Sequence, residues 1–326
     1  MRCLALATEL QRRGAEVSFY SVEGSTSVAP ALQRSGFPVY PLAAADSPID
    51  GAVLSALVVD HYGLSAPHEA TFRGKASVIA VIDDLADRPH DCDLLVDMTA
   101  GRESQAYATL APGARCLTGA EYALLRPAFS ELRSGSLRRH AEAGSLRRIL
   151  VSFGLTDPGG ITASTAELLL KAAPEASLDV VVRRASPAWR RLEQSHEMTA
   201  GDRLRLHDDP AELADLMAEA DLAIGAGGVT SWERCCLGLP TIVVRLAENQ
   251  TENIRALVSA GAAVELTSPA AIGEELVPAV VRLTTPARRQ GMSVAAGQLC
   301  DGAGARRVAD AILQAVNHVT GDRRLQ

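Results

Sequence analysis

The sequence has few aromatic side chains and no stretch long and apolar enough to span a bilayer. Phe, Trp and Tyr make up 4% of the 326 residues, so a core must be built from aliphatic side chains, which the 47% hydrophobic content supplies. No apolar run approaches the ~20 residues that a transmembrane helix needs. The N-terminal stretch has one Arg before a short apolar patch and no small-residue cleavage site, which argues against a secretory signal. We therefore expect a cytoplasmic protein without stable membrane insertion.

The sequence also lacks an excess of positive charge and any paired cysteine motif. Its net charge is -7, with acidic and basic residues mixed along the chain, which gives no electrostatic reason to bind nucleic acid. None of the six cysteines forms a C-x-x-C pair, and scattered thiols suit a reducing compartment. The His and Asp spacings match no familiar zinc pattern, and no G-x-S-x-G elbow is present. We expect a protein without metal or cofactor, and a monomer.

Short apolar runs alternate with longer helical stretches along most of the chain. Several runs are continuously apolar, which indicates strands buried on both faces in parallel sheets. The expected strands are 17–21, 54–60, 77–84, 93–98, 115–119, 148–154, 178–183, 204–208, 221–227, 241–246 and 263–266. The expected helices between them include 162–172, 210–219, 250–260 and 302–316. This rhythm predicts an α/β fold.

The alternation stops between residues 127 and 147, where Gly, Ser and charged residues are frequent and no strand is expected. We interpret this stretch as the connection between two α/β domains, 1–130 and 146–300. Residues 301–326 are expected to form a C-terminal helix that can pack back on the N-terminal domain. In such pairs the ligand usually binds in the cleft between domains, at the carboxyl ends of the strands.

The most informative stretch is AIGAGGVTSWERCCLGLP, residues 223–240, in which an apolar strand runs into glycines and then into a helix. Gly225, Gly227 and Gly228 can let the backbone come close to a ligand. The free amides of the following first helical turn suit a phosphate or diphosphate. The stretch matches neither G-x-G-x-x-G nor the P-loop, so neither of those nucleotide motifs applies.

The helix after this turn carries two hydroxyls and a lone carboxylate at its start. Thr230 and Ser231 are expected to cap it. Glu233 falls in its first turn, where a carboxylate can accept hydrogen bonds from two vicinal hydroxyls such as those of a ribose. A nucleoside diphosphate would present both groups together. The alternative is that the glycines only make a tight turn and that Glu233 only offsets the helix dipole.

Two further strand ends carry polar residues. In ILVSFGLTDPGG, Gly154 and Thr156 end a strand, and Asp157 followed by Pro fits a helix cap with a first-turn proline. Together with the glycine turn, this strand end could hold a diphosphate from two sides. Asn249 and Gln250 lie where a later strand meets a helix, and amides there can recognise sugar hydroxyls. Ordinary helix capping is the alternative for both strand ends.

Polar clusters follow two strands of the first half. They are Asp60, His61 and Tyr62 after the first of these strands, and Asp83, Asp84 and His90 after the second. Carboxylates at the end of a buried strand often face a ligand cleft, although they can also serve only to brace loops.

The chain resembles a known family in six stretches: MRCLALATEL, VVDHYGL, VIDDLADRPHDCDLLVDMT, GAEYALLRPAF, ILVSFGLTDP and ADLAIGAGGVTSWERCCLGLPTIVVRLAENQ. The family is the UDP-2,4-diacetamido-2,4,6-trideoxy-β-L-altropyranose hydrolases of pseudaminic acid biosynthesis, which are similar to GT-B glycosyltransferases of the MurG-like group. The resemblance runs from Met1 to about residue 260. It implies a GT-B-like fold with two Rossmann-type parallel-sheet domains facing a cleft.

The resemblance also implies a reaction. Water attacks C1 of a UDP-linked diacetamido-trideoxy hexose with inversion, and UDP and the free amino sugar are released. Backbone donors at 228–231 and around 154–156 would stabilise the negative charge that grows on the diphosphate.

Residue roles carry over from the same resemblance. Glu233 would hold the ribose, and the loop near His207 to Asp209 would meet the uracil. Asn249 and Gln250 would face the sugar, and Tyr62 would reach in from the first domain. Tyr62 and Asn249 are therefore the candidate catalytic residues.

The sequence departs from the family at its start. The family has a strand and a G-x-G-H motif immediately before M-R-C-L, and the His of that motif is its proposed base. This chain begins at that Met, so we expect an upstream start or a truncated chain, with little activity in the absence of the base. Two other functions remain open: a GT-B glycosyltransferase that uses a UDP-sugar donor, and a non-catalytic nucleotide-sugar-binding protein.

Overall fold

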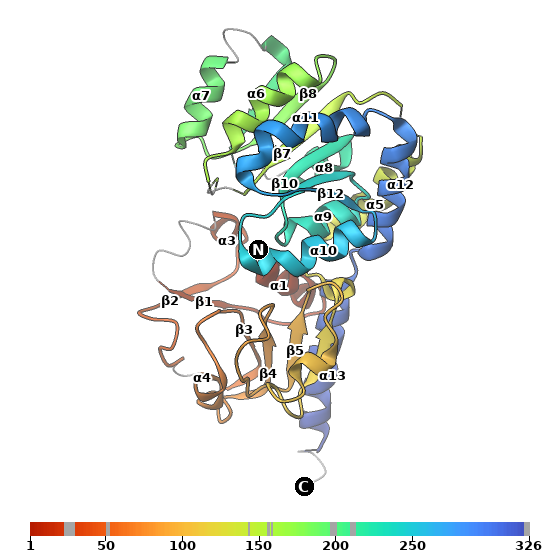
Figure 1. The fold of residues 1–326 in the computed structure, drawn as a ribbon. Helices are drawn as coiled ribbons and strands as arrows, with labels where there is room; N and C mark the ends of the chain where they lie inside the picture. Colours follow the sequence, from red (N-terminus) through yellow and green to blue (C-terminus); the bar gives the residue numbers. More distant parts are fainter. Residues whose placement is uncertain are drawn as a thin grey trace. The chain divides into compact units, whose positions relative to one another are not determined.

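The structure is a computed structural model that describes residues 1–22, 30–49, 53–142, 144–154, 157, 159–195, 201–208 and 213–322. The chain divides into two compact units. Unit 1 is Met1–Pro127 with Ala303–Gln326, and unit 2 is Ala128–Gly302. Each unit combines parallel strands with helices (Figure 1), which confirms the α/β class. The domain limits expected from the sequence stay a prediction.

Unit 2 is built on a six-stranded parallel sheet with the order β12-β11-β10-β7-β8-β9. The strands are β7 (Arg148–Ser152), β8 (Ser177–Val181), β9 (Leu204–His207), β10 (Leu222–Ala226), β11 (Thr241–Val244) and β12 (Ala263–Leu266). The chain builds β8 and β9 outward on one side of β7, and then β10 to β12 on the other side. The order therefore reverses between β7 and β10, and ligands of open α/β sheets bind outside the carboxyl ends of the strands at such a switch point.

Helices cover both faces of this sheet. They are α5 (Pro127–Ala141), α6 (Thr162–Ala172), α7 (Pro187–Ser195), α8 (Leu213–Glu219), α9 (Thr230–Cys236), α10 (Thr251–Ser259), α11 (Ile272–Leu283) and α12 (Pro286–Leu299). One face buries an aliphatic core in which Ile149 and Val180 of the sheet meet Leu169, Leu192 and Leu276. Those three leucines come from α6, α7 and α11, which gather on one side of the sheet in Figure 1.

The stretch expected as a domain connection, 127–147, is largely helical. Helix α5 begins at Pro127, a residue that suits the first turn because it has no N–H to satisfy. Arg133 Nη1 donates to the carbonyls of Cys236 (2.6 Å) and Cys300 (2.9 Å), so the helix is tied into unit 2. The absence of a strand here is confirmed for the described residues, and the helix is a feature that the sequence interpretation missed.

Unit 1 contains two parallel sheets. One has the order β3-β4-β5-β6 and the other pairs β1 with β2. The strands are β1 (Phe19–Val22), β2 (Val39–Leu42), β3 (Leu54–Val59), β4 (Ala76–Ile82), β5 (Leu94–Asp97) and β6 (Arg115–Thr118). No hydrogen bonds join β1 to β3 among the described residues, although Tyr20 and Leu57 pack against the same core. Strand β2 was not expected because it contains Pro41, which sheets tolerate on edge strands.

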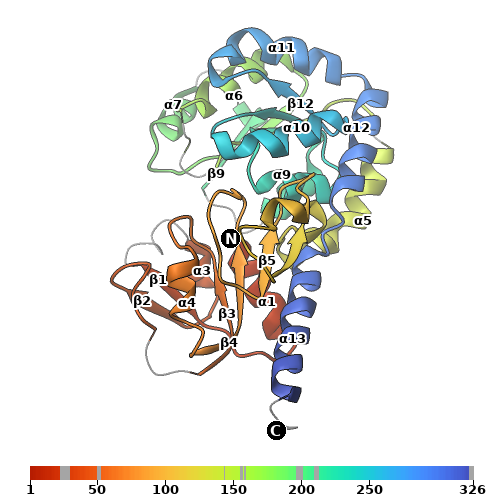
Figure 2. The same cartoon turned by 60° about the horizontal axis from the view of Figure 1, so that its bottom comes forward.

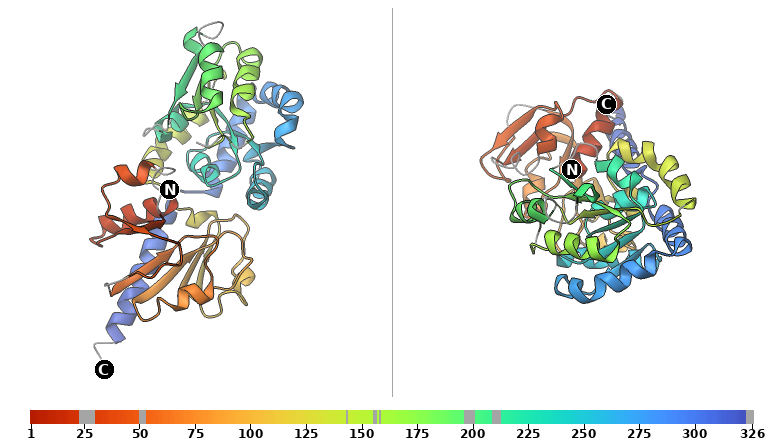
Figure 3. Two further views of the ribbon diagram at one scale, coloured as in Figure 1. Left: turned by 90° about the vertical axis from the view of Figure 1, so that its left-hand side faces the viewer. Right: turned by 90° about the horizontal axis from the view of Figure 1, so that it is seen from above.

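The helices of unit 1 include the first and last of the chain. They are α1 (Arg2–Arg12), α3 (Pro30–Arg34), α4 (Ala66–Ala70) and α13 (Gly304–Asp322). Helix α13 packs beside α1 and against β3, β4 and β5 (Figures 2 and 3). It buries a stripe of Ala305, Val308, Ala309 and Ile312, which has the spacing of one helix face. At its start a Cβ on Gly304 would lie 2.3 Å from the Ala123 carbonyl oxygen, so only glycine allows this approach.

The expected secondary structure is confirmed in most places. All eleven expected strands are present with ends shifted by at most two residues, and the helix expected at 162–172 has those limits. The helix expected at 210–219 is described from Leu213, and the last helix extends beyond the expected 316 to Asp322. None of the helices in the described part of the chain has the length and apolar character to cross a membrane.

Candidate functional site

The carboxyl end of β10 leads into the turn 227–229 and then into α9, at the switch point of the unit 2 sheet. Three successive amides in this turn, those of Gly228, Val229 and Thr230, donate to no acceptor among the described residues. The next two amides are used inside the turn, because Ser231 N donates to the Gly228 carbonyl and Trp232 N to that of Val229. Successive free backbone donors of this kind can bind an anion.

The glycines at the end of β10 and in this turn are required for different structural reasons. A Cβ on Gly225 would lie 2.6 Å from Arg234 Nη1 and 2.7 Å from the Ser152 carbonyl oxygen, and a Cβ on Gly227 would lie 2.4 Å from Ile254 Cγ1. Both positions therefore need glycine because other parts of unit 2 press against them. Gly228 is different, since the nearest atom to its Cβ position is 3.8 Å away. Close approach to a ligand stays a prediction.

The expected capping of α9 by Thr230 and Ser231 is wrong. The N-cap residue is Val229, and no side chain caps this end of the helix. Ser231 is buried, and its hydroxyl donates to the Ala226 carbonyl (3.3 Å) and accepts from Arg234 Nη2 (3.0 Å). The Thr230 hydroxyl accepts from Arg234 Nη1 at 3.4 Å. Both hydroxyls thus point back toward a buried arginine.

Glu233 lies in the first turn of α9, as expected, and 8% of it is exposed. A carboxylate can accept hydrogen bonds from hydroxyl groups, and a hydrogen bond to a charged acceptor is stronger than one between neutral groups.

Gln250 fastens this turn to the end of the neighbouring strand. Its Oε1 accepts from Gly227 N (3.2 Å) and from Leu246 N (3.0 Å). Because both partners are donors, the orientation of the amide is fixed, and its Nε2 is the atom nearest to a Cβ position on Gly228. Asn249 precedes it in a short 3-10 turn and is exposed. The expected sugar-facing pair thus contains one braced amide and one exposed amide.

The end of β7 forms the other side of the switch point. Gly154 has a positive φ of 93°, which favours glycine, and Asp157 has a φ of 44°. Asp157 Oδ1 accepts from the Thr162 amide (3.2 Å) and hydroxyl (2.6 Å). Helix α6 begins at Thr162, the expected start of the helix 162–172, and its N-cap residue is Ile161, so Asp157 is not the N-cap residue that the sequence suggested. Thr156 lies outside the described residues.

His207 is the residue expected near the base of a nucleotide. Its side chain is held by Asp179, a buried carboxylate of the neighbouring strand β8. Its Nε2 lies 2.7 Å from Oδ1 of Asp179, which is 1% exposed, and Arg148 Nε donates to the other oxygen at 2.6 Å. Burial alone would raise the pKa of Asp179, but the hydrogen bonds from His207 and Arg148 hold it below its usual value. Asp209 lies outside the described residues.

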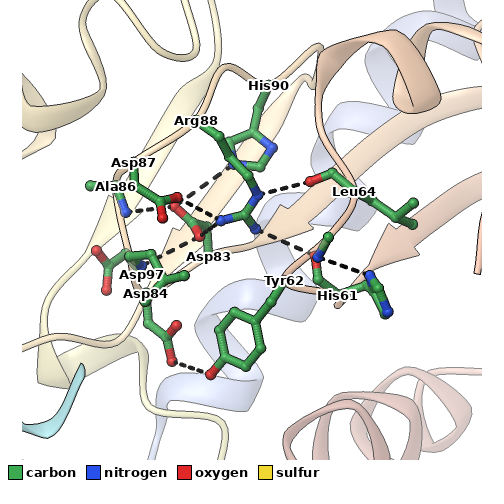
Figure 4. Close-up of polar contacts among 12 residues, drawn as sticks. His61, Tyr62, Leu64, Asp83, Asp84, Ala86, Asp87, Arg88, His90 and Asp97 are labelled. Atoms are coloured by element: carbon green, nitrogen blue, oxygen red, sulfur yellow. Dashed lines mark hydrogen bonds and ion pairs between the residues drawn. The ribbon is translucent and has the colours of Figure 1, made fainter. Parts of the chain in front are cut away.

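In unit 1 the ends of β3 and β4 bring Asp60, Tyr62 and Asp84 together around Arg2. Arg2 forms ion pairs with Asp60 (2.7 Å) and Asp84 (3.0 Å). The Tyr62 hydroxyl donates to Asp84 Oδ2 at 3.2 Å (Figure 4), and its side chain is half exposed. Burial and the nearby Asp84 carboxylate raise the pKa of Tyr62, so this hydroxyl stays protonated at neutral pH. His61 is exposed, and its Nδ1 accepts from Gly63 N at 3.0 Å.

Asp83 and His90 are buried and brace the loop that follows β4 (Figure 4). His90 Nδ1 lies 2.8 Å from Glu69 Oε1, and its Nε2 lies 3.7 Å from Asp83 Oδ2. Burial by itself lowers the pKa of His90, but the two carboxylates outweigh that effect and raise it to about 9. Their burial assigns Asp83 and His90 to the support of the loop.

The described residues contain no group of three His, Cys, Asp or Glu side chains arranged to hold a metal ion. The arrangement at the switch point instead offers free amides, an anchored amide side chain and one carboxylate. That combination suits a ligand with a phosphate at one end and vicinal hydroxyls at the other. The sequence interpretation missed Arg234, although an arginine directly after Glu233, in a helix that leads into the apolar residues 235–240, was a usable signal.

Comparison with known proteins relates unit 2 to glycosyltransferases. A family model described as the glycosyltransferase family 28 C-terminal domain matches residues 190–310. The spore coat polysaccharide biosynthesis protein SpsG of Bacillus subtilis is 30% identical over 166 residues, which are 47% of this chain and 44% of that protein. An uncharacterized protein of Methanocaldococcus jannaschii is 22% identical over 263 residues, which are 77% of this chain and 53% of that protein. The chain spans about half the length of these two relatives.

A third relative has a named reaction. The UDP-2,4-diacetamido-2,4,6-trideoxy-β-L-altropyranose hydrolase of Campylobacter jejuni is 24% identical over 225 residues, which are 66% of this chain and 76% of that enzyme. This similarity supports the wider resemblance without fixing the particular reaction of this chain.

Solved structures match over nearly the whole chain. MurG of Acinetobacter baumannii has a TM-score of 0.59 at 18% identity, covering 96% of this chain and 95% of that one. The UDP co-structure of S. aureus MnaA has a TM-score of 0.60 at 12% identity, covering 97% and 93%. At these identities the likeness concerns the fold alone, and it confirms the expected GT-B-like class.

Proposed function

We propose that this GT-B-like protein cleaves a UDP-linked diacetamido-trideoxy hexose at C1, releasing UDP and the free amino sugar. The observation that carries the proposal is the set of free amides at 228–230, placed at the switch point beside Glu233. A nucleoside diphosphate offers anionic oxygens to the amides and vicinal hydroxyls to the carboxylate. The similarity to the Campylobacter jejuni hydrolase, which covers most of that enzyme, supports the choice of reaction.

In the proposed reaction water adds to C1 as the bond between C1 and the β-phosphate oxygen breaks, and the configuration at C1 inverts. The bonding electrons leave with UDP, and the attacking water loses a proton to the solvent. Negative charge therefore grows on the diphosphate during the step. Fixed backbone donors stabilise such charge without having to reorganise at the moment of reaction.

Each site residue has a proposed role in this reaction. Glu233 accepts from the ribose hydroxyls, and the strand end at His207 contacts the uracil. Gln250 and Asn249 face the sugar, with the fixed Nε2 of Gln250 donating to an acceptor such as an acetamido carbonyl. Tyr62, whose hydroxyl is oriented by Asp84 within unit 1, is a candidate catalytic residue.

A second candidate function is glycosyl transfer from the same donor to an acceptor hydroxyl. The match of residues 190–310 to the glycosyltransferase family 28 C-terminal domain favours it, because that match covers the proposed donor-binding turn. The two functions differ only in the nucleophile. A cytoplasmic, monomeric protein that binds UDP-sugar is common to both proposals.

The test is to incubate the protein with the UDP-linked diacetamido hexose in H₂¹⁸O and to analyse both products by mass spectrometry. The proposal predicts UDP release without any acceptor, with ¹⁸O in the sugar and none in UDP. Label in UDP would mean cleavage at phosphorus and would contradict the mechanism. Release only after an acceptor is added would establish the transferase, and UDP binding without release would establish a nucleotide-sugar-binding protein. Either result overturns the hydrolase proposal.

A further inference from the structure

Arg234 is one of the largest fully buried side chains of the protein, with 2% of it exposed. It lies on α9 and reaches back to the carboxyl end of β10. Nη2 donates to the Ala226 carbonyl (2.6 Å) and to Ser231 Oγ (3.0 Å), and Nη1 donates to Thr230 Oγ1 (3.4 Å). Within the described residues Nε has no hydrogen-bond partner. Among the described residues, all the hydrogen-bond partners of this guanidinium are neutral.

No carboxylate of the described residues lies within 4 Å of Arg234, whereas many other arginines of the chain form such ion pairs. Burial lowers the pKa of Arg234 to about 10, so the group still carries its charge at neutral pH. An unpaired buried charge is expensive, because the solvation lost on burial is not replaced by a counter-ion. The neighbouring Glu233 attracts this charge electrostatically but forms no ion pair with it, so the positive charge inside unit 2 is only partly compensated.

The guanidinium is located at the switch point. A Cβ on Gly225 would lie 2.6 Å from Nη1 and 2.7 Å from the Ser152 carbonyl, and Gly225 and Ser152 are register partners on β10 and β7. The charge therefore lies where these two strands end. Gly225 keeps that space open, since any other residue would push the guanidinium away.

Arg234 also fixes the turn 227–229 through the peptide that precedes it. By holding the Ala226 carbonyl it sets the orientation of the peptide that links Ala226 to Gly227. The N–H of that peptide points to Gln250 Oε1 at 3.2 Å. The turn is thus clamped by the guanidinium at one end and by the Gln250 amide at the other, and the three free amides follow directly.

We infer that Arg234 is a positioning residue of the nucleotide site, whose buried charge attracts the diphosphate of the ligand and whose hydrogen bonds hold the turn in its anion-binding form. The inference rests on the proposed function, because it takes the switch point as the nucleotide site. It assigns Arg234 to the phosphates, and not to the base, the ribose or the sugar. Coulomb attraction across a protein interior acts over more than contact distance, so no direct contact with the ligand is required.

The test compares how variants bind UDP and uridine, because the ratio of the two dissociation constants isolates the diphosphate. Arg234→Gln removes the charge but keeps a donor for the Ala226 carbonyl. Arg234→Lys keeps the charge but loses the planar guanidinium, whose two terminal nitrogens donate to several acceptors at once. We expect Arg234→Gln to weaken UDP binding at least tenfold and uridine binding less than twofold. Arg234→Lys should give an intermediate ratio, because charge returns without the geometry.

Folding is checked by thermal unfolding of each variant. If Arg234→Gln folds and keeps the wild-type ratio, the inference is wrong. If Arg234→Gln does not fold, Arg234→Lys decides, and an unchanged ratio in that variant overturns the inference. Equal loss of UDP and uridine binding would also overturn it, because it would indicate a general structural role. Failure of the wild-type protein to bind UDP would instead refute the proposed function, so the two failures are distinguishable.

Discussion

Gly225 and Arg234 depend on each other, although nine positions separate them in the sequence. The glycine leaves the room that the guanidinium occupies, because a Cβ at this position would meet both Arg234 Nη1 and the carbonyl of Ser152 on the adjacent strand. Sequence alone suggested that this glycine serves a ligand. The structure gives it a packing reason inside unit 2.

Gly225→Ala is therefore expected to destabilise the protein by about 1–3 kcal/mol, the usual cost of overpacking a buried site. The added Cβ meets the backbone of β7, which cannot give way easily. Urea unfolding measures the effect. The matched control is Gly291→Ala on α12, where a Cβ meets nothing within 4 Å and helix propensity favours alanine, so that variant should be as stable as wild type or more so. Equal behaviour of the two variants would contradict the packing argument.

His90 makes the stability of unit 1 depend on pH. Its pKa is raised to about 9 by Asp83 and Glu69, against about 6.5 in an unfolded chain. The folded state therefore binds the proton more tightly, so the stabilisation is complete below about pH 6.5 and is lost as the pH rises through 9. We expect the free energy of unfolding to fall by roughly 1 kcal/mol per pH unit across that window.

The measurement is urea unfolding at several pH values between 6 and 10. His90→Gln should be less stable at pH 6.5, because Glu69 then loses its cationic partner while Arg88 still pairs with Asp83, and its stability should change less with pH. If the free energy of unfolding of His90→Gln falls with pH as steeply as that of the wild-type protein, a group other than His90 titrates in this range. His61 is an exposed histidine outside this pair of carboxylates, so His61→Gln is the matched control and should keep the slope.

At the scale of elements, the apolar runs predicted the strands because a strand of a parallel sheet is buried on both faces. Its residues are therefore continuously apolar, and the length of the apolar run matches the length of the strand. Strand β2 was missed because Pro41 interrupts its run, and α5 because its frequent charged residues look like a connection. The caps were wrong because the hydroxyls of Ser231 and Thr230 accept from Arg234, one turn further along the same helix, and Ser231 also donates to the Ala226 carbonyl. The free amides at 228–230 could be expected from the glycine turn, whereas the clamping of that turn could not.

Gln250 provides a test of how β10 and β11 are joined. Gln250→Glu keeps an oxygen that accepts from Gly227 and Leu246, so it should remain close to wild-type stability. It also places a carboxylate oxygen near Gly228, so UDP binding should weaken at least several-fold through repulsion. Gln250→Ala leaves both amides without their acceptor and should lower the free energy of unfolding by about 1 kcal/mol. Calorimetry and urea unfolding separate the two effects, and unchanged UDP affinity in Gln250→Glu would place the phosphates elsewhere.

At the scale of the whole molecule, the last helix belongs to the unit formed by the first residues. Helix α13 packs with α1 on the unit 1 sheet, and Arg13 pairs with Asp310 across the two helices. The end of the chain is thus required to complete the fold of its beginning. The local pattern predicted the helix, but the partner that it packs against depends on the tertiary fold.

Val308→Asp should therefore destabilise unit 1 and leave the stability of unit 2 unchanged. Val308 has 0% exposure on the packed face of α13, and an unpaired buried carboxylate costs several kcal/mol. Hydrogen exchange should rise in β3 and β4, with β7 and β10 of unit 2 unchanged. Asn317→Asp adds the same charge on the exposed face of the helix and should leave all four strands as they are. Faster exchange confined to unit 2 would contradict this assignment of α13.

The central claim is that the turn after β10 holds the diphosphate of UDP while Glu233 holds its ribose. Titration calorimetry of UDP and 2′-deoxy-UDP against the wild-type protein and Glu233→Ala tests it most directly. We predict that the wild-type protein prefers UDP at least tenfold, as expected for a hydrogen bond to a charged group, and that Glu233→Ala binds both ligands equally weakly. An undiminished preference for UDP in Glu233→Ala, or no UDP binding by the wild-type protein, would contradict the claim.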